Sequence, residues 1–248
     1  MVGSLHEVTC GDRTGSRAVA FFGRGCYVGA ANRACFAKDC RGLGVTARRE
    51  NDLARVLGDP QLPMNVPIFR THDVNSTDTQ NVLRELSPEV LCVYGTYIVR
   101  EQTLSIAPIS LNLHTGISPR YRGADCYFWP LYNAEPDWVG ATVHRCTSEV
   151  DGGEIYETAM ASLEAEDGLG AIFGRSVVAG TEIYKRTVER LLAGLSITPR
   201  AQRLSAGTKY FARMRGWKAE IRVAWLIHRG LIRRFSKVDR GRTEARDT

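Results

Sequence analysis

An amide, an imidazole and a carboxylate occur at positions where they could act on one acyl group. Asn112 and His114 alternate with leucines, so both polar side chains project from the same side of a predicted strand. Asp151 follows a second strand-like run and precedes two glycines, which favour a turn. An amide N–H can stabilise an oxyanion, a histidine can move a proton near neutral pH, and a carboxylate can orient that histidine. These three are our candidate catalytic residues.

The pattern favours direct acyl transfer over a covalent acyl-enzyme. Ser118 lies in a loop, and the sequence gives no argument for a partner base beside Cys126 or Cys146, so none is an obvious nucleophile. Each candidate also has a structural interpretation, because Asn-x-His at a strand end can be a hydrogen-bonding pair and Asp before Gly-Gly can be a turn residue. The joint arrangement of two strand ends and two glycine-containing loops favours a site over separate structural roles.

The elements that must position these residues alternate between strand and helix along the chain. The predicted strands before the site are residues 17–22, 66–69 and 90–94, and the predicted helices are residues 30–38, 46–57 and 80–86, the last opened by a capping box of Thr77 and Gln80. Such alternation predicts an α/β fold with a mostly parallel sheet covered by helices. A Gly-rich loop at residues 23–29 has one residue too many for a dinucleotide fingerprint, and a tight strand-to-helix turn explains its glycines equally well.

Apart from the strand that precedes Asp151, the sequence from residue 125 onward is predicted to be mostly helical. Residues 125–133 form an aromatic-rich segment with a helix starting or kinked near Pro130, and residues 168–193 form one long helix or two, because Gly174 and Gly180 weaken it. Gly194 suits the end of that helix, and residues 197–199 are a candidate linker. Beyond the linker we predict a strand at residues 207–212 and an amphipathic helix at residues 217–232, with Ile221, Ala224, Trp225 and Ile232 on its apolar side. We therefore expect a catalytic domain, residues 1–196, and a small basic C-terminal subdomain, residues 197–248.

Composition narrows the class of protein. The sequence has no apolar run long enough to span a bilayer and no secretion signal, so we expect a cytoplasmic protein without a membrane partner. Its seven cysteines are an odd number without zinc-type spacing, which predicts reduced thiols and no metal. From Arg200 onward, 14 Lys/Arg face 4 Asp/Glu, so this segment carries the excess of the +6 net charge. A basic segment suits an anionic substrate, a nucleic acid or a membrane surface, but few aromatics interleave it, so a nucleic-acid-binding module is only the alternative.

The sequence around the three candidates resembles the folate-dependent formyltransferases. The residues that carry the resemblance are 112–123, 140–144 and 151–155. It covers residues 88–194 and, more weakly, the chain before them. It implies a Rossmann-like formyltransferase core and an enzyme that moves a formyl group from 10-formyltetrahydrofolate, its cosubstrate, to a primary amine. It also implies that Asn112, His114 and Asp151 are the catalytic residues.

By the same resemblance, two loops bind the folate, largely through backbone groups. The first loop consists of Gly95, Thr96, Tyr97 and Ile98. The second consists of Arg145, Cys146, Thr147, Ser148, Glu149 and Val150. Backbone donors and acceptors beside small apolar side chains suit a flat pterin with polar edges.

The amine acceptor is predicted from residues 115–123. They depart from the Ser-Leu-Leu-Pro sequence of the purine and tRNA branches and are similar to enzymes acting on nucleotide-linked amino sugars, such as a dTDP-4-amino-4,6-dideoxyhexose. The candidate substrate-binding residues are Thr115, Gly116, Ile117, Arg120, Tyr121, Arg122, Tyr127 and Trp129. Aromatic rings could stack on a base or sugar and an arginine could meet a diphosphate, while aromatic packing and solvated arginines are the structural alternative. We expect a homodimer, with glycinamide ribonucleotide, aminoacyl-tRNA or water as alternative acceptors.

Overall fold

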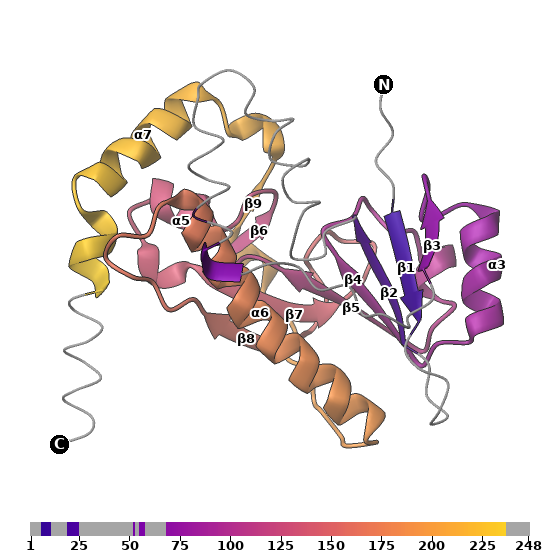
Figure 1. The fold of residues 1–248 in the computed structure, drawn as a ribbon. Helices are drawn as coiled ribbons and strands as arrows, with labels where there is room; N and C mark the ends of the chain where they lie inside the picture. Colours follow the sequence, from indigo (N-terminus) through magenta and orange to yellow (C-terminus); the bar gives the residue numbers. More distant parts are fainter. Residues whose placement is uncertain (1–5, 11–18, 25–51, 53–54, 58–67, 237–248) are drawn as a thin grey trace.

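A seven-stranded mixed sheet forms the centre of the protein (Figure 1). The structure is a computed structural model and describes residues 6–10, 19–24, 52, 55–57 and 68–236. In spatial order the strands are β3 (Ile68–Thr71), β1 (His6–Cys10), β2 (Val19–Arg24), β4 (Val90–Tyr94), β5 (Ile109–His114), β7 (Gly140–Arg145) and β8 (Ile155–Met160). The adjacent strands β2, β4 and β5 are parallel, and only β1 and β7 run against the other five of this sheet. The prediction of an α/β fold with a mostly parallel sheet is confirmed.

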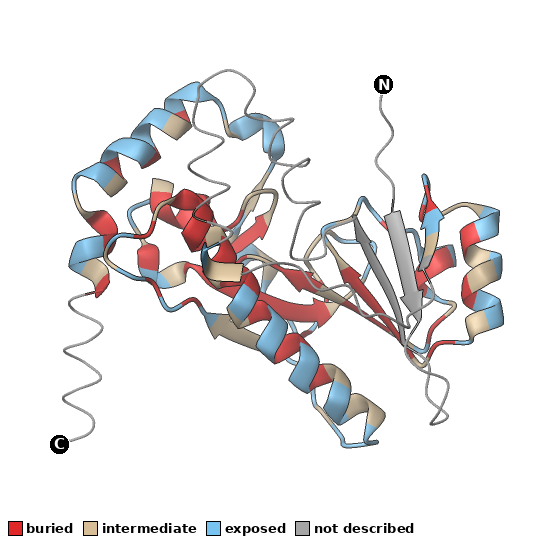
Figure 2. Cartoon of the chain, in the orientation of Figure 1, coloured by how far each residue is buried: buried red, intermediate tan, exposed pale blue. Residues whose placement is uncertain are grey.

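Helices cover both faces of strand β4, which explains why its sequence is continuously apolar. Leu91 and Val93 pack in one hydrophobic cluster with Leu83 of helix α3 (Thr77–Leu86). Val90 and Cys92 point to the other face, into a cluster with residues of helix α6 (Leu169–Leu192). Successive side chains of a strand point to opposite faces, so a strand between two helical layers is apolar at every position. Figure 2 shows the buried centre of this sheet in red.

The structure corrects the predicted start of one helix and decides between two alternatives for another. Helix α3 is capped one residue earlier than predicted, because the Ser76 side chain accepts a hydrogen bond from the Thr79 backbone at 3.2 Å. Helix α6 is one unbroken helix of 24 residues. A Cβ at Gly180 would lie 2.8 Å from Leu113 and Ala141, so this glycine lets the helix lie close to strands β5 and β7. From the sequence one can see that Gly180 lowers the helix propensity, but one cannot see this contact with the sheet.

A second, two-stranded sheet lies beside the first and joins distant parts of the chain. Strand β6 (Tyr121–Gly123) pairs in parallel with β9 (Thr208–Tyr210). Helices α5 (Trp129–Tyr132) and α7 (Trp217–His228) pack in the same hydrophobic cluster as the first turn of α6. Other short helices of the described residues are α4 (Glu101–Leu104), η2 (Pro136–Trp138), η3 (Leu204–Ala206) and η4 (Ala212–Met214). The predicted boundary at residue 196 therefore falls in a connection, but one hydrophobic cluster crosses it; the division into two domains stays a prediction.

Helix α7 buries a different side from the one predicted. Ile221 and Trp225 are 60% and 55% exposed, whereas Val223 and Leu226 point inward with Ala219. The helix has two apolar stripes, and periodicity alone does not say which one meets the core. Ile232 is buried as predicted, in a further helical turn at residues 231–236.

Some predicted elements lie outside the described residues. These are the loop after Arg24, the helix at residues 30–38 and most of the helix at residues 46–57. The strands predicted at residues 17–22 and 66–69 are present as β2 and β3, each shifted by two residues toward the C-terminus. Within the described part of the chain, no helix is long and apolar enough to cross a bilayer.

Candidate active site

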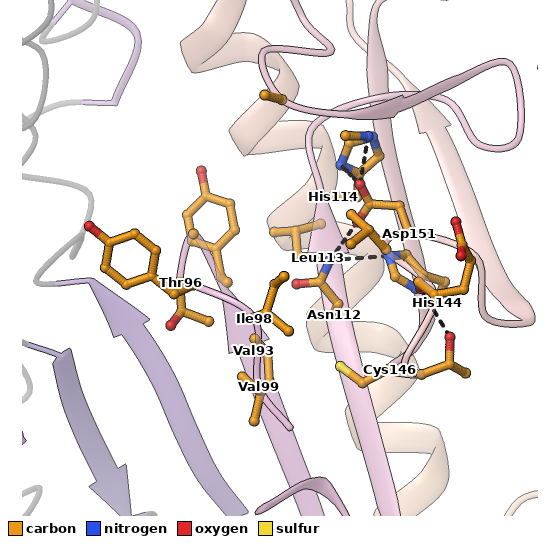
Figure 3. A pocket seen from close by; sticks show the side chains of 18 of the residues that line it. Val93, Thr96, Ile98, Val99, Asn112, Leu113, His114, His144, Cys146 and Asp151 are labelled. Carbon is orange, nitrogen blue, oxygen red and sulfur yellow. Dashed lines mark hydrogen bonds and ion pairs between the residues drawn. The ribbon is translucent and has the colours of Figure 1, made fainter. Parts of the chain in front are cut away.

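The site forms where strands β5 and β7 run side by side. Their antiparallel register places Asn112 opposite His144 and His114 opposite Thr142. Directly opposed residues project from the same face of a sheet, so the side chains of Asn112 and His144 lie next to each other. Asp151, on the loop between β7 and β8, then completes a group of four polar side chains (Figure 3).

The carboxylate of Asp151 is the centre of this group. Its Oδ2 accepts a hydrogen bond from the Gly123 backbone nitrogen at 2.8 Å and lies 3.4 Å from Nδ1 of His114. Its Oδ1 lies 3.3 Å from both Asn112 Nδ2 and His144 Nε2. The backbone of Asp151 has a φ of +51°, a conformation that Asp and Asn adopt more readily than most residues. Its side chain is 10% exposed, so these contacts replace most of its hydration.

These contacts keep Asp151 ionised. Burial alone would raise the pKa of the carboxyl. The neighbouring His114 and His144 and the Gly123 backbone N–H outweigh burial and hold the pKa of Asp151 well below its ordinary value. The site therefore keeps a fixed negative charge beside two imidazoles at neutral pH.

The hydrogen bonds define which ring nitrogens can exchange a proton. Nε2 of His114 lies 2.9 Å from the Tyr121 carbonyl, and a carbonyl only accepts, so this nitrogen carries a hydrogen. Nδ1 of His114 is then the atom that gains or loses a proton, and it faces Asp151. Nδ1 of His144 donates in the same way to the Arg145 carbonyl at 2.8 Å, which leaves its Nε2 facing Asn112 at 3.1 Å. His114 is thus placed to move protons and His144 to orient the amide.

A cavity of about 640 Å³ opens beside this group, a volume within the range of small-molecule sites. Both loops expected to bind folate line it, namely Gly95, Thr96, Tyr97 and Ile98, and Cys146, Thr147, Ser148, Glu149 and Val150. Figure 3 shows Thr96 and Ile98 across the cavity from Asp151. Arg145 does not line it, because its guanidinium pairs with Glu154 and donates to Tyr156.

The residues expected to bind the acceptor differ from one another in whether they line the cavity. Thr115 lines the cavity. Gly116 lies against the His114 ring, where a Cβ would collide, and Ile117 is buried. Tyr127 is buried, and its hydroxyl accepts a hydrogen bond from Arg215. These last three support the site without lining the cavity.

Arg120 and its neighbours are held by other protein groups. Arg120 forms a two-pronged ion pair with Glu135, and the Tyr121 hydroxyl donates to the same carboxylate. Trp129 is buried and stacks on Tyr210 at 4.6 Å. The structure thus favours the packing interpretation for Arg120, Tyr121 and Trp129, since none of them lines the cavity.

Two parts of the candidate active site were not predicted from the sequence. The sequence indicates His144 only as part of a strand, and the register of β7 against β5 is what places it beside Asn112. The segment from Lys209 to Ala212 also lines the cavity, and no sequence signal connects it to residues that precede it by so many positions.

The two cysteines near the site remain thiols. Burial, together with the charge of Asp151, raises the pKa of Cys146 to about 12. Burial likewise raises the pKa of Cys126 well above its ordinary value. A thiolate is the reactive form of cysteine, so neither is suited to covalent catalysis. Among the described residues, no cluster of three or more His, Cys, Asp or Glu side chains could hold a metal ion.

Comparison with known proteins identifies the family. The model of the formyl transferase family matches residues 35–188, which is more than half of the chain. The chain therefore belongs to the formyl transferase family, whose members are transferase enzymes.

Solved structures show the same fold. A sugar N-formyltransferase from Shewanella sp FDAARGOS_354 is 16% identical with a TM-score of 0.50, covering 61% of this chain and 64% of that one. A protein of Mycobacterium tuberculosis, whose assignment as a sugar N-formyltransferase is itself an inference, is 17% identical with a TM-score of 0.50, covering 71% and 80%. The chain spans less than two thirds of the Shewanella enzyme, and at these identities the likeness concerns the fold alone.

Proposed function

We propose that this protein transfers the formyl group of 10-formyltetrahydrofolate to the primary amine of a nucleotide-linked amino sugar, such as a dTDP-4-amino-4,6-dideoxyhexose. The observation that carries the proposal is the ionised Asp151, held between two imidazoles and beside the Asn112 amide at the edge of the cavity. Membership of the formyl transferase family supplies the reaction class. The sugar acceptor is supported by the resemblance of residues 115–123 to the sugar-nucleotide branch.

The cavity lining suits the folate. Ile98 and Tyr97 are 69% and 58% exposed on one wall, so apolar surface is available to a pterin ring. The backbone of residues 95–98 and 146–150 supplies donors and acceptors for the polar edges of that ring. Asn112 lies between this wall and Asp151 in Figure 3, so a formyl group bound there would reach the polar group.

The reaction needs one bond exchanged and one proton moved. The amine nitrogen bonds to the formyl carbon, the bond from that carbon to the folate nitrogen breaks, and a proton passes from the amine to that nitrogen. Asn112 donates from Nδ2 to the developing oxyanion, replacing its 3.3 Å contact with Asp151. His114 carries the proton at Nδ1, and Asp151 stabilises the charged ring. His144 holds the amide of Asn112 in place.

A panel of amines incubated with 10-formyltetrahydrofolate tests the proposal by mass spectrometry. We expect the mass of one formyl group to be added to an amino-sugar nucleotide. Glycinamide ribonucleotide and aminoacyl-tRNA belong in the same panel, as the alternative acceptors. Release of free formate without a formylated amine would instead show a hydrolase. A cytoplasmic location and a homodimer also stay predictions, to be tested by fractionation and by light scattering.

A second function, a nucleic-acid-binding module built on the basic C-terminal segment, is less well supported. Lys209 pairs with Glu149, Arg215 with Asp125 and Arg233 with Glu166, so several of its cations already have acidic partners. Nucleic-acid binding through such a segment would weaken steeply with salt. Titration with a fluorescent single-stranded oligonucleotide at two salt concentrations distinguishes it from the enzyme.

A further inference from the structure

The end of strand β9 and the residue after it, Lys209 to Phe211, line one wall of the cavity, with the half-buried Tyr210 between the other two. The Tyr210 ring stacks on Trp129 at 4.6 Å and on Tyr121 at 5.7 Å, against the hydrophobic cluster that contains α5 and α7. Successive side chains of an extended chain point to opposite sides, and the backbone stays extended at Phe211, with φ −114° and ψ 147°. Lys209 and Phe211 therefore point away from Trp129 and Tyr121, and both line the cavity, together with part of Tyr210.

Strand β6 fixes the position of these two residues relative to the catalytic carboxylate. The Ala124 backbone donates to the Tyr210 carbonyl at 2.9 Å, and the preceding Gly123 donates to Asp151 at 2.8 Å. A Cβ at Gly123, whose φ is +92°, would collide with the Tyr210 carbonyl. Strand β9 is therefore held one strand away from Asp151, close enough for one small substrate to contact both.

A positive charge lies at this wall of the cavity. Lys209 is the register partner of Arg122, and both cations approach the same oxygen of Glu149, at 3.1 and 3.5 Å. The Arg122 side chain is 7% exposed, and its Nε has no hydrogen-bond partner in the described structure. One carboxylate thus faces two cations, and the Lys209 side chain remains 31% exposed. The excess cation suits a second, incoming anion.

Phe211 adds an apolar ring to the same wall. It is 39% exposed, and the Arg213 guanidinium lies 4.6 Å from its ring centroid. An aromatic ring with a cation against one face can stack on a planar base with its other face. Arg120, the alternative cation for a diphosphate, is engaged by Glu135 and lies over Trp138 at 4.6 Å, away from the cavity.

We infer that Lys209 and Phe211 form the subsite for the nucleotide part of the amine substrate, with Lys209 contacting the diphosphate and Phe211 the base. This inference rests on the proposed formyl transfer to a nucleotide-linked amino sugar. It assigns acceptor recognition to the C-terminal segment, whereas the loops at residues 95–98 and 146–150 contact the folate. The basic segment thereby has a role in recognising a small anionic substrate.

The folate also carries anionic carboxylates, so the test must separate donor from acceptor. Steady-state kinetics of the full chain would compare Lys209→Gln and Phe211→Leu with Lys218→Gln and Trp225→Leu, which alter exposed residues of α7. We expect both subsite variants to raise the KM for the amino-sugar nucleotide roughly 10- to 100-fold, with kcat and the KM for the folate donor nearly unchanged. The α7 variants should behave like the wild type. A rise confined to the KM for the folate donor would overturn the inference.

Direct binding makes the test independent of the reaction. Calorimetric titration with UDP and with dTDP should give a weaker Kd for both subsite variants than for the wild type, with circular dichroism confirming the fold of each variant. Binding of UDP or dTDP that depends on Lys209, in a protein that formylates no amine, would refute the proposed function and support the subsite. Unchanged binding in both subsite variants, or no binding by the wild type, would overturn the subsite.

Discussion

The Gly123 backbone nitrogen donates a hydrogen bond to Asp151 across 2.8 Å. This contact joins the small sheet, which contains β6, to the loop that follows β7 of the large sheet. Because β6 also pairs with β9, the Asp151 carboxylate and the C-terminal segment are positioned by one short strand. The candidate active site thus lies at the junction of the two sheets, and substitutions can test its parts separately.

Replacing Asp151 with Asn should abolish most turnover and retain the fold. The change removes the charge that stabilises the protonated His114, and Asn tolerates the φ of +51° at this position. We expect kcat to fall by about 10²- to 10⁴-fold, the usual contribution of acid–base catalysis. The exposed Asp137→Asn is the matched control and should retain wild-type activity. Near-normal turnover of Asp151→Asn would rule out the proposed role of this carboxylate.

The two histidines should differ in their effect on the pH dependence of the rate. His114→Ala removes the proton carrier, so kcat should fall and lose the limb of its pH profile that reports this group. His144→Asn removes the contact that orients Asn112 and the 3.3 Å contact with Asp151 but leaves His114 in place, so kcat should fall by a smaller factor and that limb should remain. Formylation rates measured across about pH 5 to 9 would distinguish them. Identical profiles for both variants would contradict the separate roles.

Acid should destabilise the wild type through Asp151. Its pKa is lowered in the folded protein, so its stabilising contribution is complete above the unfolded pKa of about 3.9 and is lost as the pH falls toward the folded value. The free energy of unfolding of the wild type should therefore fall more steeply below about pH 4 than that of Asp151→Asn. Urea unfolding at several acidic pH values measures both slopes. Equal slopes would show that the carboxyl is not stabilised in its ionised form.

Tyr184 should contribute to stability through its hydroxyl. This group accepts from the Val93 backbone and donates to the Leu111 carbonyl, both at 2.8 Å, between strands β4 and β5. Tyr184→Phe leaves both backbone groups without this partner, which should cost about 1–3 kcal/mol in the free energy of unfolding. Tyr132→Phe, a half-buried tyrosine outside the large sheet, is the control. A loss of similar size in both variants would contradict the specific role of Tyr184.

Cys146 should be dispensable for the chemistry although it lines the cavity. Its raised pKa keeps it a thiol, so Cys146→Ala should retain turnover within a few-fold of the wild type. Intact-mass spectrometry of the wild type during turnover should show no formylated enzyme. A covalent formyl adduct that disappears in Cys146→Ala would replace direct amine attack with a two-step mechanism.

The sequence by itself determined the features that depend on neighbouring residues. The continuous apolar run of β4 predicted a strand buried on both faces, because alternate side chains meet different helical layers. The alternation at Asn112 and His114 predicted that they share one side of a strand, and the structure places both at the cavity. The Asp151 turn was visible in its two glycines.

Tertiary structure decided which distant residues join them. His144 reaches Asp151 because β7 pairs with β5 in one register, and Lys209 reaches the cavity because β9 pairs with β6. The buried side of α7 was likewise set by its packing partner, since two apolar stripes compete along that helix. Strand register and the choice of a buried face depend on contacts between segments far apart in the chain, whereas side-chain alternation and turn preference are local properties of the backbone.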